Sequence, residues 1–163
     1  MRRYKFLFIL IICVIVSVLF SPVVSMGASR MNAADFAIFC KKATLTEIRE
    51  SLSLGSVMSD QALIVAAFNN PDPEVMKLLM NTAKDAGLDL AKSQKIGAGV
   101  LNSAIRGGRP EVVKAIIAFG VNVNASDKTF RTPLAEARYC GMNSQDPDRR
   151  EIINIILAAG ARR

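Results

Sequence analysis

The side chains with the clearest chemical potential in this sequence are four glutamates that recur at similar places. They are Glu47, Glu74, Glu111 and Glu151. Paired carboxylates can act as general acid and base or can bind a metal ion. Each glutamate, however, lies near the expected start of a helix, where a negative charge complements the helix dipole. We therefore interpret all four as structural, and we expect no catalytic residue, no metal site and no cofactor.

The absence of histidine removes most alternatives. The chain has 163 residues and no histidine, which excludes Ser-His-Asp and Cys-His nucleophiles as well as imidazole metal sites. The short run Gly97-Ala98-Gly99 lacks the rest of a Walker or dinucleotide-binding loop. We expect a protein that is not an enzyme.

The first 28 residues have the order of a secretory signal peptide. Three basic residues precede an apolar run over residues 6–20, and Pro22 and small residues follow it. We interpret 1–28 as a signal peptide, which predicts export to a bacterial periplasm or secretion. The alternative is an uncleaved N-terminal anchor in the inner membrane. A spanning helix needs about 20 apolar residues, a length that this run reaches only by crossing Pro22.

The charge of the remaining chain is modest. Three of the 21 Lys and Arg residues lie within 1–28, whereas none of the 14 Asp and Glu residues does, so the remainder has a net charge of +4. This balance gives no reason to expect nucleic acid as a partner, because nucleic-acid-binding domains are usually strongly basic.

A fixed spacing organises the chain beyond the signal. Three pairs of residues are 33 positions apart: Leu101 and Leu134, Ala104 and Ala137, and Gly108 and Gly141. One further apolar stretch follows Gly108 and ends at Gly120, and another follows Gly141 and ends at Gly160. Self-similarity at this period is typical of stacked repeats. Thr132 and Pro133 suit the start of a helix, as N-cap and first helical residue.

The stretch GGRPEVVKAIIAFGVNVNASDKTFRTPLAEA, residues 107–137, resembles an ankyrin repeat followed by the start of another. The resemblance implies an all-α fold, an ankyrin-repeat α-solenoid of about four helix-loop-helix units with short β-hairpin connectors. The repeat domain would cover 31–163, with units at about 33–60, 61–96, 97–129 and 130–163. The first unit lacks the Thr-Pro-Leu start and would be an N-terminal cap. Another type of α-solenoid is the alternative.

The sequence departs from the ankyrin pattern at two places. Ankyrin repeats usually carry a histidine after Thr-Pro-Leu that bonds neighbouring backbone, and the matching positions here hold Ile64, Asn102 and Ala135. Only Asn102 can replace that bond, so we expect weaker coupling between repeats and more fraying. We call Leu101 and Leu134, with the matching residues of the other units, the anchors. The residue four positions before the anchor is Gly97 in the third unit but Phe130 in the last unit, where a positive φ would be strained.

The resemblance implies a binding surface made of hairpin tips and first helices, used to bind another protein. The fifth position after each anchor, and Glu136 at a second position, should face outward, with Lys128 and Phe130 at a tip. Aromatic residues and Arg are common at interface hot spots. The alternative is that Phe68 packs between repeats and that the charges are only solvated. The seven candidate residues are Lys41, Phe68, Arg106, Lys128, Phe130, Glu136 and Tyr139.

We expect a monomer that serves as an exported adaptor, or as a protective or inhibitory partner of an envelope protein. A membrane-tethered ankyrin scaffold is the alternative. Cys40 and Cys140 fall in the first and last units. Three repeat steps of about 8–10 Å exceed the Cα separation of about 7 Å that a disulfide allows, so both cysteines should be free.

Overall fold

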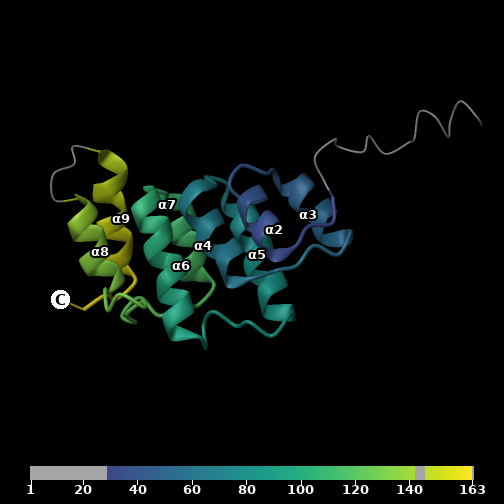
Figure 1. The fold of residues 1–163 in the computed structure, drawn as a ribbon. Helices are drawn as coiled ribbons and strands as arrows, with labels where there is room; N and C mark the ends of the chain where they lie inside the picture. Colours follow the sequence, from purple (N-terminus) through teal and green to yellow (C-terminus); the bar gives the residue numbers. More distant parts are fainter. Residues whose placement is uncertain (1–28, 142–145, 163) are drawn as a thin grey trace, which may run out of the picture.

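The computed structural model describes residues 29–141 and 146–162 (Figure 1). The predicted signal peptide at 1–28 lies outside the described residues. Within the described ranges the chain has eight helices and no strand, which confirms the all-α fold and leaves the expected β-hairpin connectors without support. The helices are α2 (Ala33–Phe39), α3 (Leu45–Ser53), α4 (Asp60–Asn69), α5 (Pro73–Asp85), α6 (Gln94–Gly107), α7 (Pro110–Ala118), α8 (Pro133–Gly141) and α9 (Pro147–Ala158).

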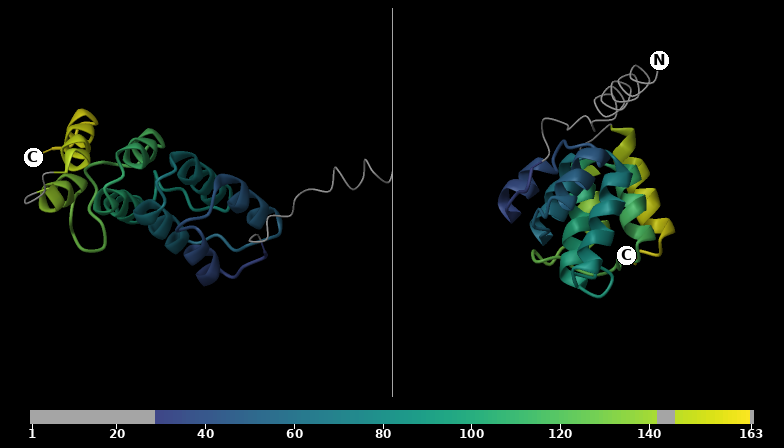
Figure 2. Two further views of the ribbon diagram at one scale, coloured as in Figure 1. Left: turned by 90° about the horizontal axis from the view of Figure 1, so that it is seen from above. Right: turned by 90° about the vertical axis from the view of Figure 1, so that its right-hand side faces the viewer.

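The helices lie in two rows. Helices α2, α4, α6 and α8 pack in succession to form the first row, and α3, α5, α7 and α9 form the second. From α4 onward each helix of the first row also packs on the next helix in the chain. Figures 1 and 2 show these pairs following one another along the molecule, from purple to yellow. Among the described residues, no helix combines the length and the apolar character that crossing a membrane requires.

Local sequence signals explain where the second-row helices begin. Thr44 and Glu47 form a capping box at the start of α3. Helices α5, α7 and α9 each have proline in their first turn, where its missing N–H costs nothing. Asp72 and Asp146 cap α5 and α9 by accepting backbone N–H groups two residues ahead, at 2.9 and 3.0 Å.

Three of the four recurring glutamates lie at the start of a helix, as predicted. Glu47, Glu74 and Glu111 lie in the first turn of their helices. Glu151 does not, because α9 already begins at Pro147 and has Asp148 in its first turn. The expected position of Glu151 at the helix start is therefore wrong, because α9 extends about one turn further at its N-terminus. Its role is still structural, since Lys114 Nζ of α7 lies 2.8 Å from its Oε1.

The glycines that end the second-row helices have the left-handed backbone that glycine tolerates best. Gly120 and Gly160 have φ of 98° and 89°, as predicted. Gly97 has another role than a turn, because α6 begins three residues earlier, at Gln94, and includes it. A Cβ at Gly97 would lie 2.5 Å from the Leu90 carbonyl oxygen, so this position requires glycine for close packing.

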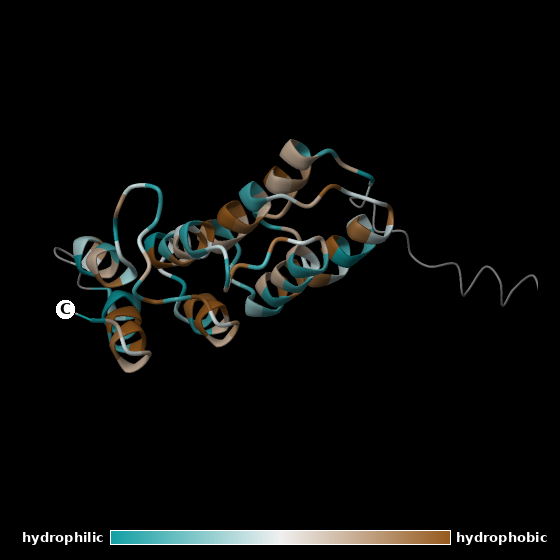
Figure 3. Cartoon of the chain, turned by 90° about the horizontal axis from the view of Figure 1, so that it is seen from below, coloured by the Kyte–Doolittle hydropathy of each residue, from teal (hydrophilic) through white to brown (hydrophobic). Residues whose placement is uncertain are grey.

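The core lies between the two rows and between successive pairs. It is built from aliphatic side chains and methionines, with alanines at several contacts of the first row. Figure 3 shows that brown apolar stretches alternate with teal polar stretches along the helices, and that the connections mix both kinds of residue. At the end of α6 the backbone of α4 comes so close that a Cβ on Gly107 would lie 2.3 Å from the Phe68 carbonyl oxygen.

Each boundary between successive pairs has a side chain that bonds the C-terminal end of the preceding first-row helix. The accepting carbonyls lie at or just beyond the end of that helix, where backbone donors are scarce, and Ile105 O also accepts the Gly108 N–H at 3.1 Å. The donors are an amide at the first boundary and guanidinium groups at the next two. The bonds are Asn70 Nδ2 to Cys40 O (3.1 Å) and Ala43 O (2.9 Å), Arg109 Nη2 to Asn69 O (3.3 Å), Arg149 Nη1 to Ile105 O (2.8 Å) and Arg149 Nη2 to Arg106 O (3.0 Å).

Candidate protein-binding face

The four candidates at the fifth position after the anchor are all exposed. Lys41 lies in the turn after α2, and Phe68, Arg106 and Tyr139 lie near the C-terminal ends of α4, α6 and α8. Phe68 is 45% exposed and Tyr139 is 61% exposed. Phe68 is thus not enclosed between the pairs, and an aromatic side chain faces solvent on each of α4 and α8.

The turn at residues 127–131 presents two further candidates, Lys128 and Phe130. The backbone N–H of Asp127 donates to the Arg131 carbonyl at 3.1 Å, and that of Phe130 donates to the Asp127 carbonyl at 3.1 Å. These bonds close a narrow turn without making strands. Phe130 has φ of 61° and is 87% exposed at its tip. A bulky residue in this conformation is strained, as the sequence led us to expect.

The Asp127 carboxylate holds this turn together. Its Oδ1 accepts the Thr129 N–H at 2.7 Å, the Thr129 hydroxyl at 2.6 Å and the Arg131 N–H at 3.2 Å. Burial opposes ionisation of Asp127, but the hydrogen bonds from Thr129, Asn102 and Arg131 outweigh it and hold its pKa below the usual value. The carboxylate therefore stays charged and fixes the tip that carries Lys128 and Phe130.

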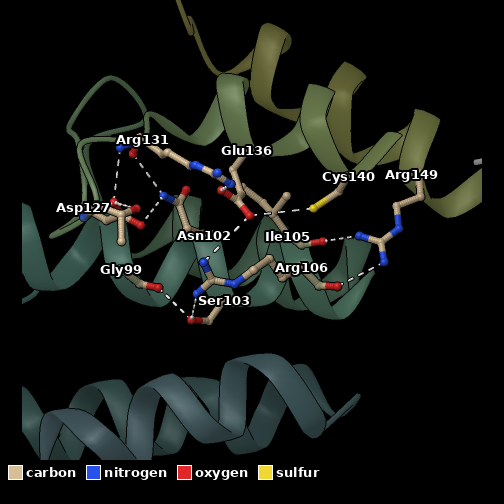
Figure 4. A network of polar contacts seen from close by, with 11 residues as sticks. Gly99, Asn102, Ser103, Ile105, Arg106, Asp127, Arg131, Glu136, Cys140 and Arg149 are labelled. Atoms are coloured by element: carbon tan, nitrogen blue, oxygen red, sulfur yellow. Dashed lines mark hydrogen bonds and ion pairs between the residues drawn. The ribbon is translucent and has the colours of Figure 1, made fainter. Parts of the chain in front are cut away.

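Asn102 connects α6 to this turn. It is fully buried, and its Nδ2 donates to Asp127 Oδ2 at 2.9 Å and to the Arg131 carbonyl at 3.0 Å (Figure 4). Asn102 therefore does bond the segment that leads into α8, a contact that Ile64 and Ala135 could not make. The expectation that this boundary is weakly coupled is not supported, because further polar contacts surround the bond.

Glu136 does not face outward, and the prediction for it is wrong. Its side chain is 1% exposed. Arg131 Nη1 lies 3.2 Å from its Oε2, and Arg106 Nη1 lies 3.7 Å from its Oε1 (Figure 4). The second position after the anchor of α8 therefore faces α6 rather than solvent. The two arginines supply the positive charge that a buried carboxylate needs. Ser103, at the same position in α6, is also buried.

Arg131 lies beside these candidates, and the sequence did not predict its role. Besides pairing with Glu136, its guanidinium lies 4.6 Å from the centroid of the Tyr139 ring, within cation–π range. The order Asp127-Lys128-Thr129 is an available signal for a carboxylate-stabilised turn, and that turn places Arg131 beside α8. We call Phe68, Arg106, Lys128, Phe130 and Tyr139 the first-row face.

Neither cysteine adds reactive chemistry to the first-row face. Both are free, as predicted. Burial raises the pKa of the Cys40 thiol to about 12. Burial and the Glu136 charge raise the pKa of Cys140, whose Sγ lies 3.8 Å from Glu136 Oε1. Since the thiolate is the reactive form, both thiols should be poor nucleophiles.

A hollow of about 160 Å³ adjoins the first-row face. It lies between α4, α6 and the 127–131 turn, and Arg106 and Lys128 contribute to its lining. Within the described parts of the chain, no group of three or more Cys, Asp or Glu side chains could hold a metal ion. No family model matches the chain, and no curated protein matches it.

Proposed function

We propose that this chain is an ankyrin-type stack that binds another protein, is exported, and catalyses no reaction. The Asn102 contact supports the ankyrin-type arrangement most directly. Asn102 occupies the position where the ankyrin pattern has histidine, and it donates to the turn that opens the following unit. The two rows of packed helices agree with a stack of four units in which each unit contacts its neighbours.

The first-row face supports binding as the function. Exposed aromatic side chains are costly to leave in water and are enriched at interface hot spots. Phe68, Phe130 and Tyr139 are exposed together with Arg106 and Lys128. The strain at Phe130 points the same way, because strained residues persist mainly where function requires them.

The proposal of export rests on residues 1–28, whose order resembles that of a signal peptide. We propose an exported adaptor, or a protective or inhibitory partner of an envelope protein, which acts as a monomer. Cell fractionation with N-terminal sequencing of the mature protein tests this. A chain that retains residue 1 and sediments with membranes would instead favour a membrane-tethered scaffold.

Affinity capture from the native cell envelope, followed by quantitative mass spectrometry, tests the first-row face. The variant F68A/Y139A should lose the captured partner, because it removes two exposed aromatic anchors. We avoid charge reversal at Arg106, which would place a second carboxylate beside Glu136.

The matched control is V57A/L157A, which removes two exposed apolar side chains outside the first-row face. Both variants should unfold within a few degrees of the parent, since exposed substitutions change stability little. Equal capture by the parent and F68A/Y139A would remove Phe68 and Tyr139 from the binding surface.

A further inference from the structure

The hollow beside the first-row face has a size suited to side chains. Its volume of about 160 Å³ is below the range of about 300–1,000 Å³ that is usual for cofactor and drug-sized ligands. Helix α4, one side of α6 from Lys95 to Arg106 and the 127–131 turn surround it. It is therefore open to one or two side chains of a partner protein.

The wall formed by the two helices is apolar. Ile64 of α4 and Ile96 of α6 line the hollow, and both are only partly buried. Gly99 also lines the hollow, and a Cβ placed on Gly99 would have no neighbouring atom within 4 Å. The absent side chain thus leaves room against α6 for an aliphatic group, whose burial would be favourable.

The rim of the hollow is basic. Lys95 and Lys128 line it from α6 and from the turn, both are exposed, and neither has an ion-pair or hydrogen-bond partner for its ammonium group among the described residues. These two lysines also line a shallower depression that continues past Ser93 and Gln94. Arg106 lies at the other end, with its side chain 40% exposed.

The two acidic side chains of the lining keep their charge but direct their oxygens to neutral donors rather than to Lys95 or Lys128. Asp127 is occupied by Thr129, Asn102 and the Arg131 backbone. Asp60 accepts the Gln61 N–H at 2.9 Å at the start of α4. The lining thus holds three cationic and two anionic side chains, and the ammonium groups of Lys95 and Lys128 remain available to pair with a carboxylate of a partner.

We propose that the hollow binds a polypeptide segment in which an aspartate or glutamate stands next to an aliphatic residue. The aliphatic side chain lies against Ile64, Ile96 and Gly99, and the carboxylate lies between Lys95 and Lys128. This inference rests on the proposed protein-binding function and names the chemistry of the partner. A polypeptide fits better than a nucleic acid, because a phosphate backbone offers no aliphatic side chain for the apolar wall.

Selection from a displayed library of random dodecapeptides tests the proposal, with the purified protein expressed with its own N-terminal segment as bait. Enriched peptides should share an acidic residue beside Leu, Ile or Val. The leading peptide should then bind at least about tenfold more weakly to K95E/K128E in fluorescence anisotropy, because two attractive charges become repulsive. The same charge-reversed bait should no longer enrich acidic peptides.

The control K42E/R162E makes the same change in net charge at exposed positions away from the hollow. It should bind the leading peptide within about twofold of the parent, since distant surface charges are screened. Equal weakening by both variants, enrichment of acidic peptides without aliphatic neighbours, or tighter binding of a random single-stranded DNA than of the peptide would each overturn the proposal.

Failure of this inference differs from failure of the proposed function. If selection yields peptides without acidic residues and F68A/Y139A abolishes their binding, the hollow proposal is wrong and protein binding by the first-row face stands. If no peptide is enriched relative to selection on the support without protein, the hollow proposal is also wrong. Protein binding itself falls only if envelope capture with the parent chain also finds no partner.

Discussion

The two sides of α6 are held by different physical means. Toward α4, the contact is close and mainly apolar, and Gly107 allows the backbone to approach the Phe68 carbonyl. Toward α8, the buried Asn102 amide donates two hydrogen bonds, and the buried Glu136 carboxylate lies between two arginines. The comparison shows that one helix can use shape on one side and buried polar groups on the other. The first depends on the absence of a side chain, and the second on the presence of several.

The largest effect should come from filling the space at Gly107. G107A places a Cβ only 2.3 Å from the Phe68 carbonyl oxygen, so α4 and α6 must move apart. Overpacking of this kind costs about 1–3 kcal/mol and occasionally more, and the rigid backbone neighbour puts this case at about 3. Urea unfolding followed by circular dichroism measures it.

The control for this change is G99A in the same helix. A Cβ at Gly99 meets nothing within 4 Å, and alanine favours a helix over glycine by up to about 1 kcal/mol. G99A should therefore be neutral or stabilising. A destabilised G99A, or an unchanged G107A, would contradict the close-packing account of the α4–α6 boundary.

Removing an arginine should break the polar boundary more than removing the glutamate. R131M leaves the buried Glu136 carboxylate with the longer Arg106 contact as its remaining cationic partner among the described residues. Uncompensated buried charge is costly, so we expect a loss of about 2 kcal/mol. E136Q leaves two arginines that are each at least 40% exposed and should cost less. Chemical denaturation of both single variants and of the double variant gives the coupling energy. An E136Q loss that exceeds the R131M loss would be the opposite of this expectation.

The turn side of the polar boundary should depend on pH through Asp127. Its pKa is lowered in the folded protein. Its contribution is therefore fully present above the unfolded value of about 3.9, and it is lost as pH falls below that value through the folded pKa. D127N should lose about 1–2 kcal/mol at neutral pH by weakening several hydrogen bonds. Denaturation curves at successive pH values from neutral to strongly acidic would show the parent and D127N converging at low pH. Parallel curves throughout would assign the acid sensitivity to other carboxylates.

The smallest effect should be a gain at Phe130. Glycine tolerates the φ of 61° that strains phenylalanine, and the ring is too exposed to contribute packing. F130G should therefore raise stability by up to about 1 kcal/mol, visible as a higher Tm. The same variant should bind the partner less well. A gain in stability with unchanged binding would make the strain incidental.

The sequence predicted the parts of the fold that depend on local rules. Proline in the first turns, the glycines with left-handed backbone and the spacing of 33 all follow from properties of single residues or helices. Asn102 was also predictable, because few side chains at that position can bond a neighbouring unit. The exposure of Phe68 and Tyr139 followed from the same register.

The features that the sequence did not predict depend on how each helix is rotated about its axis and on which residues pack against it. Glu136 and Tyr139 lie one turn apart on α8, yet one is buried and the other exposed, because the facing arginines come from α6 and the turn. Gly97 looked like a turn glycine, although it lies inside α6 and makes room for Leu90. The hollow beside the first-row face combines residues from three segments, and no single segment indicates it.

The bonds that cover the ends of the first-row helices all run backward along the chain. Asn70, Arg109 and Arg149 each donate to a helix that precedes them by at least 27 positions. During synthesis from the N-terminus, the first-row helix of each of the first three pairs therefore lacks these bonds until part of the next pair has been made. A chain truncated after α7 would leave the carbonyls at the end of α6 without Arg149. Completion of the chain thus becomes a condition for closing its middle, and incompletely translated products would expose an unfinished end to proteases.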